Sequence, residues 1–105
     1  MPDAFEEVLK ALSAEYRGKL PERLAEVQRL WGLAPSDAES MAVLRRELHT
    51  LAGSASTFGL PGLTVAARAA EQQLDEVIER KAGLDAAKIG SLLDEVRQAA
   101  GLPAA

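Results

Sequence analysis

The chain has 105 residues, 48% of them hydrophobic, which suffices for one small core, so we expect a single domain over residues 1–105. Sixteen acidic and 12 basic side chains give a net charge of −4, which argues against nucleic acid as a partner. The chain has no cysteine and one histidine, and this excludes a thiolate metal site, a cysteine nucleophile and a histidine-rich metal site.

Alanine, leucine, glutamate and arginine dominate the sequence and favour helix throughout. Apolar residues at three- and four-residue spacing predict a first amphipathic helix over about residues 4–17. Its stripe consists of Phe5, Leu9, Leu12 and Tyr16. We expect Gly18 and Pro21 to interrupt this helix, because proline has no N–H to donate to the carbonyl four residues earlier. A second, nearly collinear helix then ends near Gly32, and its stripe consists of Leu20, Leu24, Val27 and Trp31.

A third helix is predicted from Ser36 to Gly59. Ser36 and Glu39 have the spacing of a capping box, and glycine suits the left-handed position that follows many helices. The core stripe of this helix consists of Met41, Leu44, Leu48, Leu51, Ala55 and Phe58.

Two further helices complete the predicted fold. The fourth begins at Pro61 and ends near Gly83. Its buried face consists of Leu63, Ala66, Ala67, Ala70, Leu74, Val77 and Ile78. The fifth is capped by Asp85 and ends near Gly101. Its stripe consists of Ile89, Leu92, Leu93 and Val96. Short loops make sequential helices antiparallel, so we expect an all-α fold, an antiparallel up-down four-helix bundle preceded by a short N-terminal helix.

The single histidine, His49, lies in the third helix and is turned away from the leucine stripe, so we expect an exposed imidazole. Five residues share its side of the helix, namely Ala42, Arg45, Ala52, Gly53 and Ser56. Four of them are small, and a glycine inside a helix costs about 1 kcal/mol relative to alanine. We interpret the small residues as a docking face for a partner that approaches His49. An ordinary solvated histidine, with Gly53 serving helix packing, is the alternative.

The segment from Glu47 to Leu60, ELHTLAGSASTFGL, resembles the signature of histidine-containing phosphotransfer (HPt) domains of two-component phosphorelays. The similarity continues through Leu63 to Leu74, and the predicted helix order resembles the bundle of that family. The resemblance implies that His49 carries a phosphoryl group as phosphohistidine. The family usually has lysine three residues after the histidine, where this chain has Ala52.

Helix geometry predicts which residues lie level with His49. The third helix rises about 13 Å from His49 to Phe58, and an antiparallel helix that starts at Pro61 returns this distance at Glu71 or Gln72. A carboxylate there would accept a hydrogen bond from Nδ1–H and leave Nε2 free. Members of the resembled family commonly have Glu or Gln at the position of Glu71. Alternatively, Glu71 is a solvated charge paired with a neighbour such as Arg68.

Three arginines are candidates to replace the missing lysine as cationic support for the phosphoryl group. Arg45 and Arg46 precede His49 by about one turn, and Arg68 precedes Glu71 by about one turn on the next helix. A guanidinium binds phosphoryl oxygens well, and Arg45 is the first choice. Arginines on a solvated bundle face are also ordinary, so each is alternatively a surface residue.

These observations predict a phosphorelay intermediate, in which His49 accepts a phosphoryl group from a receiver-domain aspartate and passes it to another receiver aspartate. The chain has no GxGxxG or GxxxxGK[ST] motif, so we expect a phosphoryl carrier without autonomous kinase activity. The resemblance implies that Mg²⁺ belongs to the receiver, and we expect no cofactor and no metal on this chain.

Other interpretations remain open. Within the same chemistry, the chain is alternatively the substrate domain of a chemotaxis-type histidine kinase or a part of a hybrid histidine kinase, although Met1 and the Leu-Pro-Ala-Ala ending slightly favour a free-standing protein. A non-catalytic helical adaptor is the alternative from another class, with Phe58, Leu60 and Leu63 as an exposed apolar patch.

The expected partners are response-regulator receiver domains or a hybrid histidine kinase, and the chain is expected to be a monomer. The sequence has no run of about 18 apolar residues, and its N-terminus is acidic, so we expect neither a membrane span nor a secretory signal. The cytoplasm is the expected compartment.

Overall fold

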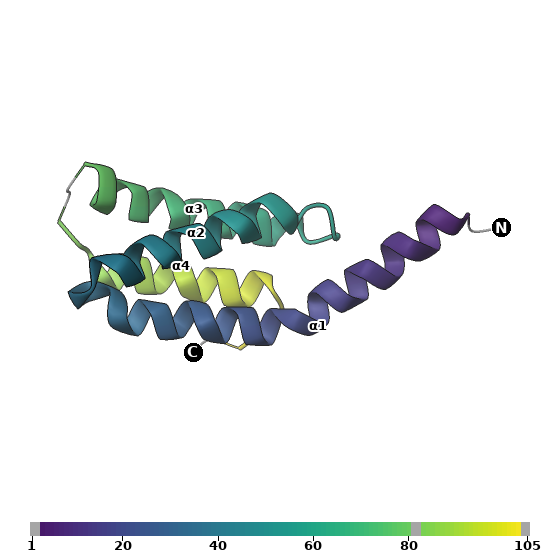
Figure 1. Ribbon diagram of the computed structural model, residues 1–105, viewed down its shortest axis with the longest axis horizontal. Coiled ribbons are helices and arrows are strands. Elements are labelled where there is room, and N and C mark those ends of the chain that lie inside the picture. The colour runs from purple at the N-terminus through teal and green to yellow at the C-terminus, as the bar shows by residue number, and fades with distance from the viewer. Residues whose placement is uncertain (1–2, 81–82, 104–105) are drawn as a thin grey trace.

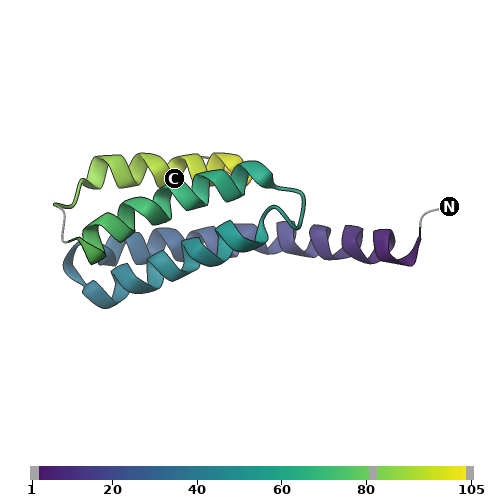
Figure 2. The same ribbon diagram turned by 90° about the horizontal axis from the view of Figure 1, so that it is seen from above.

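The computed structural model describes residues 3–80 and 83–103. The elements are α1 (Ala4–Leu33), a short 3₁₀ turn η1 (Ala34–Ser36), α2 (Ala38–Ser54), α3 (Pro61–Glu79) and α4 (Ala86–Ala99). No strand occurs in this part of the chain. The chain reverses direction between successive helices, so that they lie along a common long axis (Figures 1 and 2). The predicted all-helical fold is confirmed.

The first two predicted helices form one helix, so the predicted break at Gly18 and Pro21 was wrong. α1 continues for 30 residues with Pro21 inside it. Proline removes one backbone hydrogen bond, here the bond to the carbonyl of Arg17, but it need not end a helix whose flanking turns are held in place. Leu20 and Leu24 supply that support, because both are 1% exposed in the core. Figure 1 shows that α1 bends where its N-terminal half leaves the bundle.

The core lies between the four helices, and each predicted stripe of the bundle contributes to it. α2 packs against both α1 and α3, and α3 packs against α4. The largest fully buried side chains are Leu20, Leu24, Leu44, Leu48, Leu51, Leu63, Leu74, Ile89 and Val96. α2 is therefore held from two sides, which fixes the rotation of this helix about its axis and so determines which residues it exposes.

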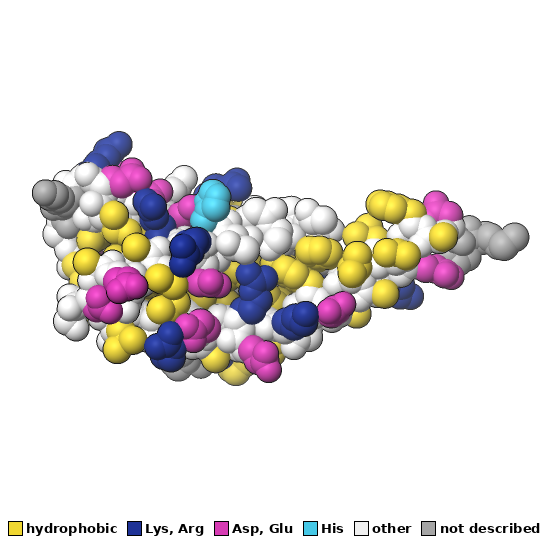
Figure 3. Space-filling view, viewed as in Figure 1, with side chains coloured by type: hydrophobic (Ala, Val, Ile, Leu, Met, Phe, Trp, Pro, Cys, Tyr) yellow, Lys and Arg dark blue, Asp and Glu magenta, His cyan; other side chains and the backbone are white. Residues whose placement is uncertain are grey.

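The N-terminal part of α1, residues 4–15, extends beyond the bundle, and we call it the overhang (Figures 1 and 2). The bundle does not cover the N-terminal part of the predicted stripe, of which Leu9 is half-buried. Phe5 is 72% exposed, Val8 56% and Leu12 46%, whereas Tyr16, the next residue of the stripe, is buried. Figure 3 shows hydrophobic side chains gathered along the overhang.

Three predicted helix boundaries were wrong, and two of them are the start of α2 and the end of α3. Asp37, and not Ser36, caps α2, because Pro35 belongs to η1 and this turn moves the cap one residue along the chain. The Asp37 carboxylate accepts hydrogen bonds from the Ser40 hydroxyl at 2.6 Å and the Glu39 N–H at 3.2 Å. These hydrogen bonds, the one from Ser40 above all, hold the pKa of Asp37 below its usual range. At the other boundary, α3 ends at Glu79, before the predicted end near Gly83.

The turn between α2 and α3 spans residues 55–60 and sends α3 back along α2. α2 ends at Ser54, five residues before the predicted end at Gly59. Gly59 has φ +83°, a left-handed conformation that costs other residues about 1–2 kcal/mol. The Phe58 ring stacks on the Tyr16 ring of α1 with centroids 4.7 Å apart. This turn sets the register of α3 against α2.

The same turn buries the residues that the adaptor interpretation required to be exposed. Leu63 is fully buried, and Phe58 and Leu60 are half-buried against the core. The exposed patch that the adaptor alternative required is therefore not found, because the turn folds these three residues onto the bundle.

Candidate functional site

Two neighbouring residues of α2 differ sharply in exposure. Leu48 is fully buried, whereas the side chain of His49 is 75% exposed. The 100° step between successive helix residues produces this contrast once Leu48 is in the core. His49, shown in cyan in Figure 3, stands out from the middle of the bundle.

A carboxylate of α3 holds the imidazole in one orientation. His49 Nδ1 lies 2.6 Å from Oε2 of Glu71, whose side chain is only 16% exposed. A carboxylate accepts hydrogen bonds, so Nδ1–H donates and Nε2 keeps its lone pair free toward solvent. Residue counting narrowed this partner to Glu71 or Gln72, and the structure selects Glu71. The pairing with Arg68 that we weighed for Glu71 is not found in the described residues.

His49 borders an open hollow of about 480 Å³ between α2 and α3. The residues that line it are Ala42, Arg45, Arg46, His49, Glu71, Asp75 and Glu79. Two cationic and three acidic side chains therefore surround the imidazole. A hollow of this composition suits a charged group that is bound from solvent and released again.

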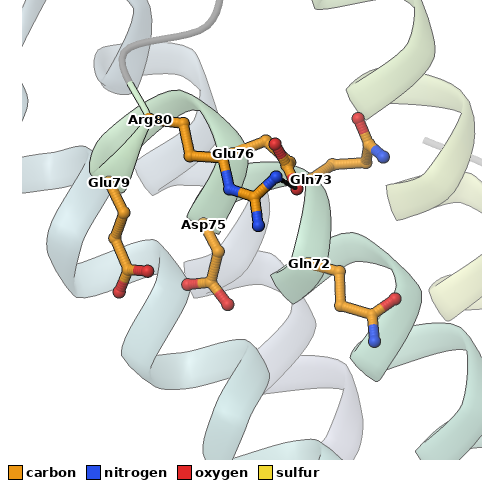
Figure 4. Close-up of a pocket in the computed structure, with 6 residues that line it drawn as sticks. All are labelled: Gln72, Gln73, Asp75, Glu76, Glu79 and Arg80. Atoms are coloured by element: carbon orange, nitrogen blue, oxygen red, sulfur yellow. Dashed lines mark ion pairs between the residues drawn. The ribbon is translucent and has the colours of Figure 1, made fainter.

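Arg45, the first choice among the arginines, is occupied by two carboxylates. Its Nη1 lies 3.1 Å from Asp75 Oδ1 and 3.0 Å from Glu79 Oε1. Figure 4 shows Asp75 and Glu79 pointing to the same side of α3. Sequence analysis did not find these two partners, although Glu71, Asp75 and Glu79 repeat every four residues and so share one helix face.

Arg46 lines the same hollow, is exposed, and forms no ion pair within the described residues. It is therefore the free cation nearest in sequence to His49. Arg68 is also exposed, but it does not line the hollow. Gln72 is exposed and borders a neighbouring hollow on α3, where Arg80 turns toward Glu76 (Figure 4). The structure thus brings Arg46, but neither Arg68 nor Gln72, to the hollow of His49.

The predicted docking face is exposed except at one residue. Ala42, Gly53 and Ser56 are exposed, and a side chain added at Gly53 would meet no atom within 4 Å. Ala52 is only 4% exposed, so its assignment to the exposed face was wrong. It lies about 40° around the helix from Leu48, closer to the buried stripe than to His49. Its methyl group is too short to reach solvent from there.

Sequence analysis missed two hydroxyl groups near the end of α2, one of which contacts α1. The Thr50 hydroxyl donates to the Arg46 carbonyl at 3.1 Å, and the Ser54 hydroxyl donates to the Thr50 carbonyl at 2.9 Å. Tyr16 Oη lies 2.8 Å from Ser54 Oγ. Serine and threonine inside a helix often bond the carbonyl four residues earlier, which is the signal that sequence offers for such a relay.

Within residues 3–80 and 83–103, no group of three or more His, Cys, Asp or Glu side chains is arranged to hold a metal ion. None of the described helices is both long and apolar enough to cross a membrane.

One comparison with known protein families gives a match that covers most of the chain. The family model of the Hpt domain matches residues 11–100, which include His49, Glu71 and all of α2, α3 and α4. No curated protein and no solved structure matches the chain. Hpt domains carry phosphoryl groups in two-component signalling and interact with receiver domains of response regulators. With the match covering most of its length, the chain belongs to the Hpt domain family and has a histidine phosphotransfer role in two-component signalling.

Proposed function

We propose that His49 is the residue that carries the phosphoryl group. The observation that supports this assignment is its hydrogen bond to Glu71, 2.6 Å long, on an imidazole whose side chain is 75% exposed. Exposure lets another protein reach Nε2, and the hydrogen bond at Nδ1 fixes the tautomer in which Nε2 is a nucleophile. His49 is also the only histidine of the chain.

In the proposed transfer, Nε2 of His49 attacks the phosphorus of an aspartyl phosphate on a receiver domain. The N–P bond forms as the P–O bond to the aspartate breaks, and the electron pair stays on the receiver's carboxylate. The imidazole ring becomes positively charged because Nδ1 keeps its proton, and the Glu71 carboxylate stabilises this charge. In the second half of the relay, a carboxylate oxygen of another receiver attacks phosphorus and His49 regains its lone pair.

Residues around His49 have two further roles in the proposed transfer, which are docking of the receiver and stabilisation of the phosphoryl charge. A receiver docks on an exposed surface of small residues, namely Ala42, Gly53 and Ser56. Arg46, which is not engaged by a carboxylate, supplies positive charge to the phosphoryl oxygens. Mg²⁺ is assigned to the receiver, and this chain contributes the positioned nucleophile without a cofactor or a kinase activity of its own.

The test is incubation of the protein with phosphorylated receiver domains, followed by analysis of the label on this chain. We expect label that is labile in acid and stable in base, as a phosphoramidate is, and its loss in His49→Gln. Gln72→Ala is the matched control, because Gln72 is an exposed residue next to Glu71 that lies outside the hollow. Label that persists in His49→Gln, or no label on the folded wild-type chain with any receiver, would overturn the assignment.

A further inference from the structure

Charged side chains of α2 and α3 meet in level pairs along the hollow of His49. His49 pairs with Glu71. Arg45, one turn earlier in α2, pairs with Asp75, one turn later in α3, because the two helices run in opposite directions. Glu79, a further turn along α3, reaches the same guanidinium. Of the three carboxylates on this face of α3, one therefore holds the imidazole and two hold Arg45.

Arg45 lies close enough to His49 to meet a group that is bound there. Side chains four residues apart on a helix are neighbours, with Cβ atoms about 5–6 Å apart. Helical side chains also lean toward the N-terminal end of their helix, so the imidazole lies over the turn that carries Arg45. Both side chains line the same hollow. From this position a free guanidinium can bind phosphoryl oxygens through two parallel N–H donors.

The two carboxylates compete with a phosphoryl group for this guanidinium. Arg45 Nη1 lies 3.1 Å from Asp75 Oδ1 and 3.0 Å from Glu79 Oε1. Both carboxylates belong to α3 and point to the same side of it (Figure 4), and α3 packs against α2. They are therefore in place before a phosphoryl group arrives. Moving Arg45 to His49 would break two ion pairs and form one.

The charge of the hollow acts in the same direction. Three carboxylates and two guanidinium groups leave it with an excess of one negative charge, and a phosphoryl group adds more. Arg46 forms no ion pair within the described residues, so the hollow offers one free cation although it contains two. A carrier that held the phosphoryl group with both cations would favour keeping it over passing it on.

We propose that Asp75 and Glu79 withhold Arg45 from the phosphoryl group on His49 and so lower the preference of the site for its phosphorylated state. This role rests on the function proposed above for His49. Asp75 and Glu79 act through Arg45, so they are positioning residues. The imidazole keeps its own partner, Glu71, and the hydrogen bond that fixes its tautomer does not depend on them.

The first test needs no receiver. Phosphoramidate, a small phosphoryl donor, loads the chain in urea, where its single histidine is free to react. Urea titration of the loaded and the unloaded chain at mildly basic pH gives two unfolding equilibrium constants. By linkage, their ratio reports how strongly the folded site favours the phosphoryl group. In Asp75→Asn/Glu79→Gln this ratio should favour the loaded chain about three- to fivefold more than in the wild type.

The gain should depend on Arg45. Adding Arg45→Ala to the double variant should abolish most of it, whereas a simple loss of negative charge would leave it in place. Asp94→Asn/Glu95→Gln is the matched control, because it makes the same two changes on α4, outside the hollow, and should give the wild-type ratio. A double variant with the wild-type ratio, or a gain that survives Arg45→Ala, would contradict the proposal.

Folding of the variants is a condition of this test. The two substitutions remove exposed ion pairs and leave the core unchanged, so circular dichroism should show a folded double variant. Glu79→Gln alone, at a side chain that is 66% exposed, should give a smaller gain in the same direction. No gain in this folded single variant or in the double variant would count against the proposed competition for Arg45.

Transfer from a phosphorylated receiver domain is the second test. The equilibrium constant for transfer to this chain should be about three- to fivefold larger for Asp75→Asn/Glu79→Gln than for the wild type. No label on the wild type would contradict the function proposed for His49, and the urea titration would still decide the role of the two carboxylates. Equal equilibrium constants for two labelled proteins would contradict only that role.

Discussion

The two sides of α2 contribute to the protein in different ways. On one side Leu44, Leu48 and Leu51 are fully buried and hold the helix between α1 and α3. On the other side Ala42, His49 and Gly53 are exposed and hold nothing in place. The buried side fixes the rotation of the helix, and the exposed side uses that rotation to present His49. Stability and phosphotransfer therefore depend on different residues of the same few turns, and substitutions on either side should separate them.

The largest expected effect is on the buried side. Leu48→Ala removes a fully buried side chain and leaves a cavity, so it should lower the free energy of unfolding by about 2–5 kcal/mol. Denaturant titration followed by circular dichroism measures this loss. Phosphotransfer per folded molecule should stay near the wild-type rate. A loss of transfer in molecules that remain folded would break the separation between the two sides.

The next effect is on the chemistry. Glu71→Ala removes the charged acceptor from His49 Nδ1, and a hydrogen bond to a charged group contributes about 1.5–3 kcal/mol. The initial rate of labelling should therefore fall about 10- to 100-fold. Glu71→Gln, which keeps an oxygen acceptor without the charge, should lie between this variant and the wild type. Equal rates for all three proteins would remove Glu71 from the proposed mechanism.

Gly53 tests the docking face. Gly53→Ala should raise the free energy of unfolding by up to about 1 kcal/mol, because the site is helical and open, and transfer should persist. Gly53→Lys should fold as well but obstruct the receiver. The comparison is made with the same phosphorylated receiver for both variants. An unchanged transfer rate in Gly53→Lys would show that the receiver docks elsewhere.

The smallest effects should come from the two arginines of the hollow. Arg45→Ala breaks two exposed ion pairs and should lower the free energy of unfolding by about 0.2–1 kcal/mol. Arg46→Ala should leave stability unchanged and slow transfer more than Arg45→Ala does, because its charge is free to meet the phosphoryl group. Thermal melts and initial labelling rates, measured in low and moderate salt, distinguish the two. A stronger effect of Arg45→Ala on transfer would reverse their roles.

Sequence predicted the parts of the fold that local rules determine. The periodicity of α2, α3 and α4, the cap at Asp85 and the proline that opens α3 are all found in the structure. The register of Glu71 against His49 could also be predicted, because a short turn leaves little freedom in where α3 begins. Both helices are nearly regular, so counting their rise narrowed the partner of His49 to Glu71 or Gln72.

The remaining features depend on contacts between distant residues. The continuity of α1 through Pro21 depends on the packing of Leu20 and Leu24, which outweighs one lost hydrogen bond. The stripe of the overhang has the same spacing whether it is buried or exposed. Arg45 forms ion pairs with Asp75 and Glu79, which lie on another helix within reach of its long side chain. Helix periodicity does not determine which acceptors such a side chain pairs with.

Because α1 is continuous, it carries two intrinsic fluorophores at a fixed separation along one helix. The chain has one tyrosine and one tryptophan, Tyr16 and Trp31, and both belong to this helix. They are 15 residues apart, which corresponds to about 22 Å of helix. Trp31 packs against the core, and Tyr16 is buried where the overhang joins the bundle. Tryptophan emission should therefore follow unfolding of the bundle, whereas tyrosine emission should follow both unfolding and events at the overhang. A change in tyrosine emission without a change in tryptophan emission would then mark an event at the overhang.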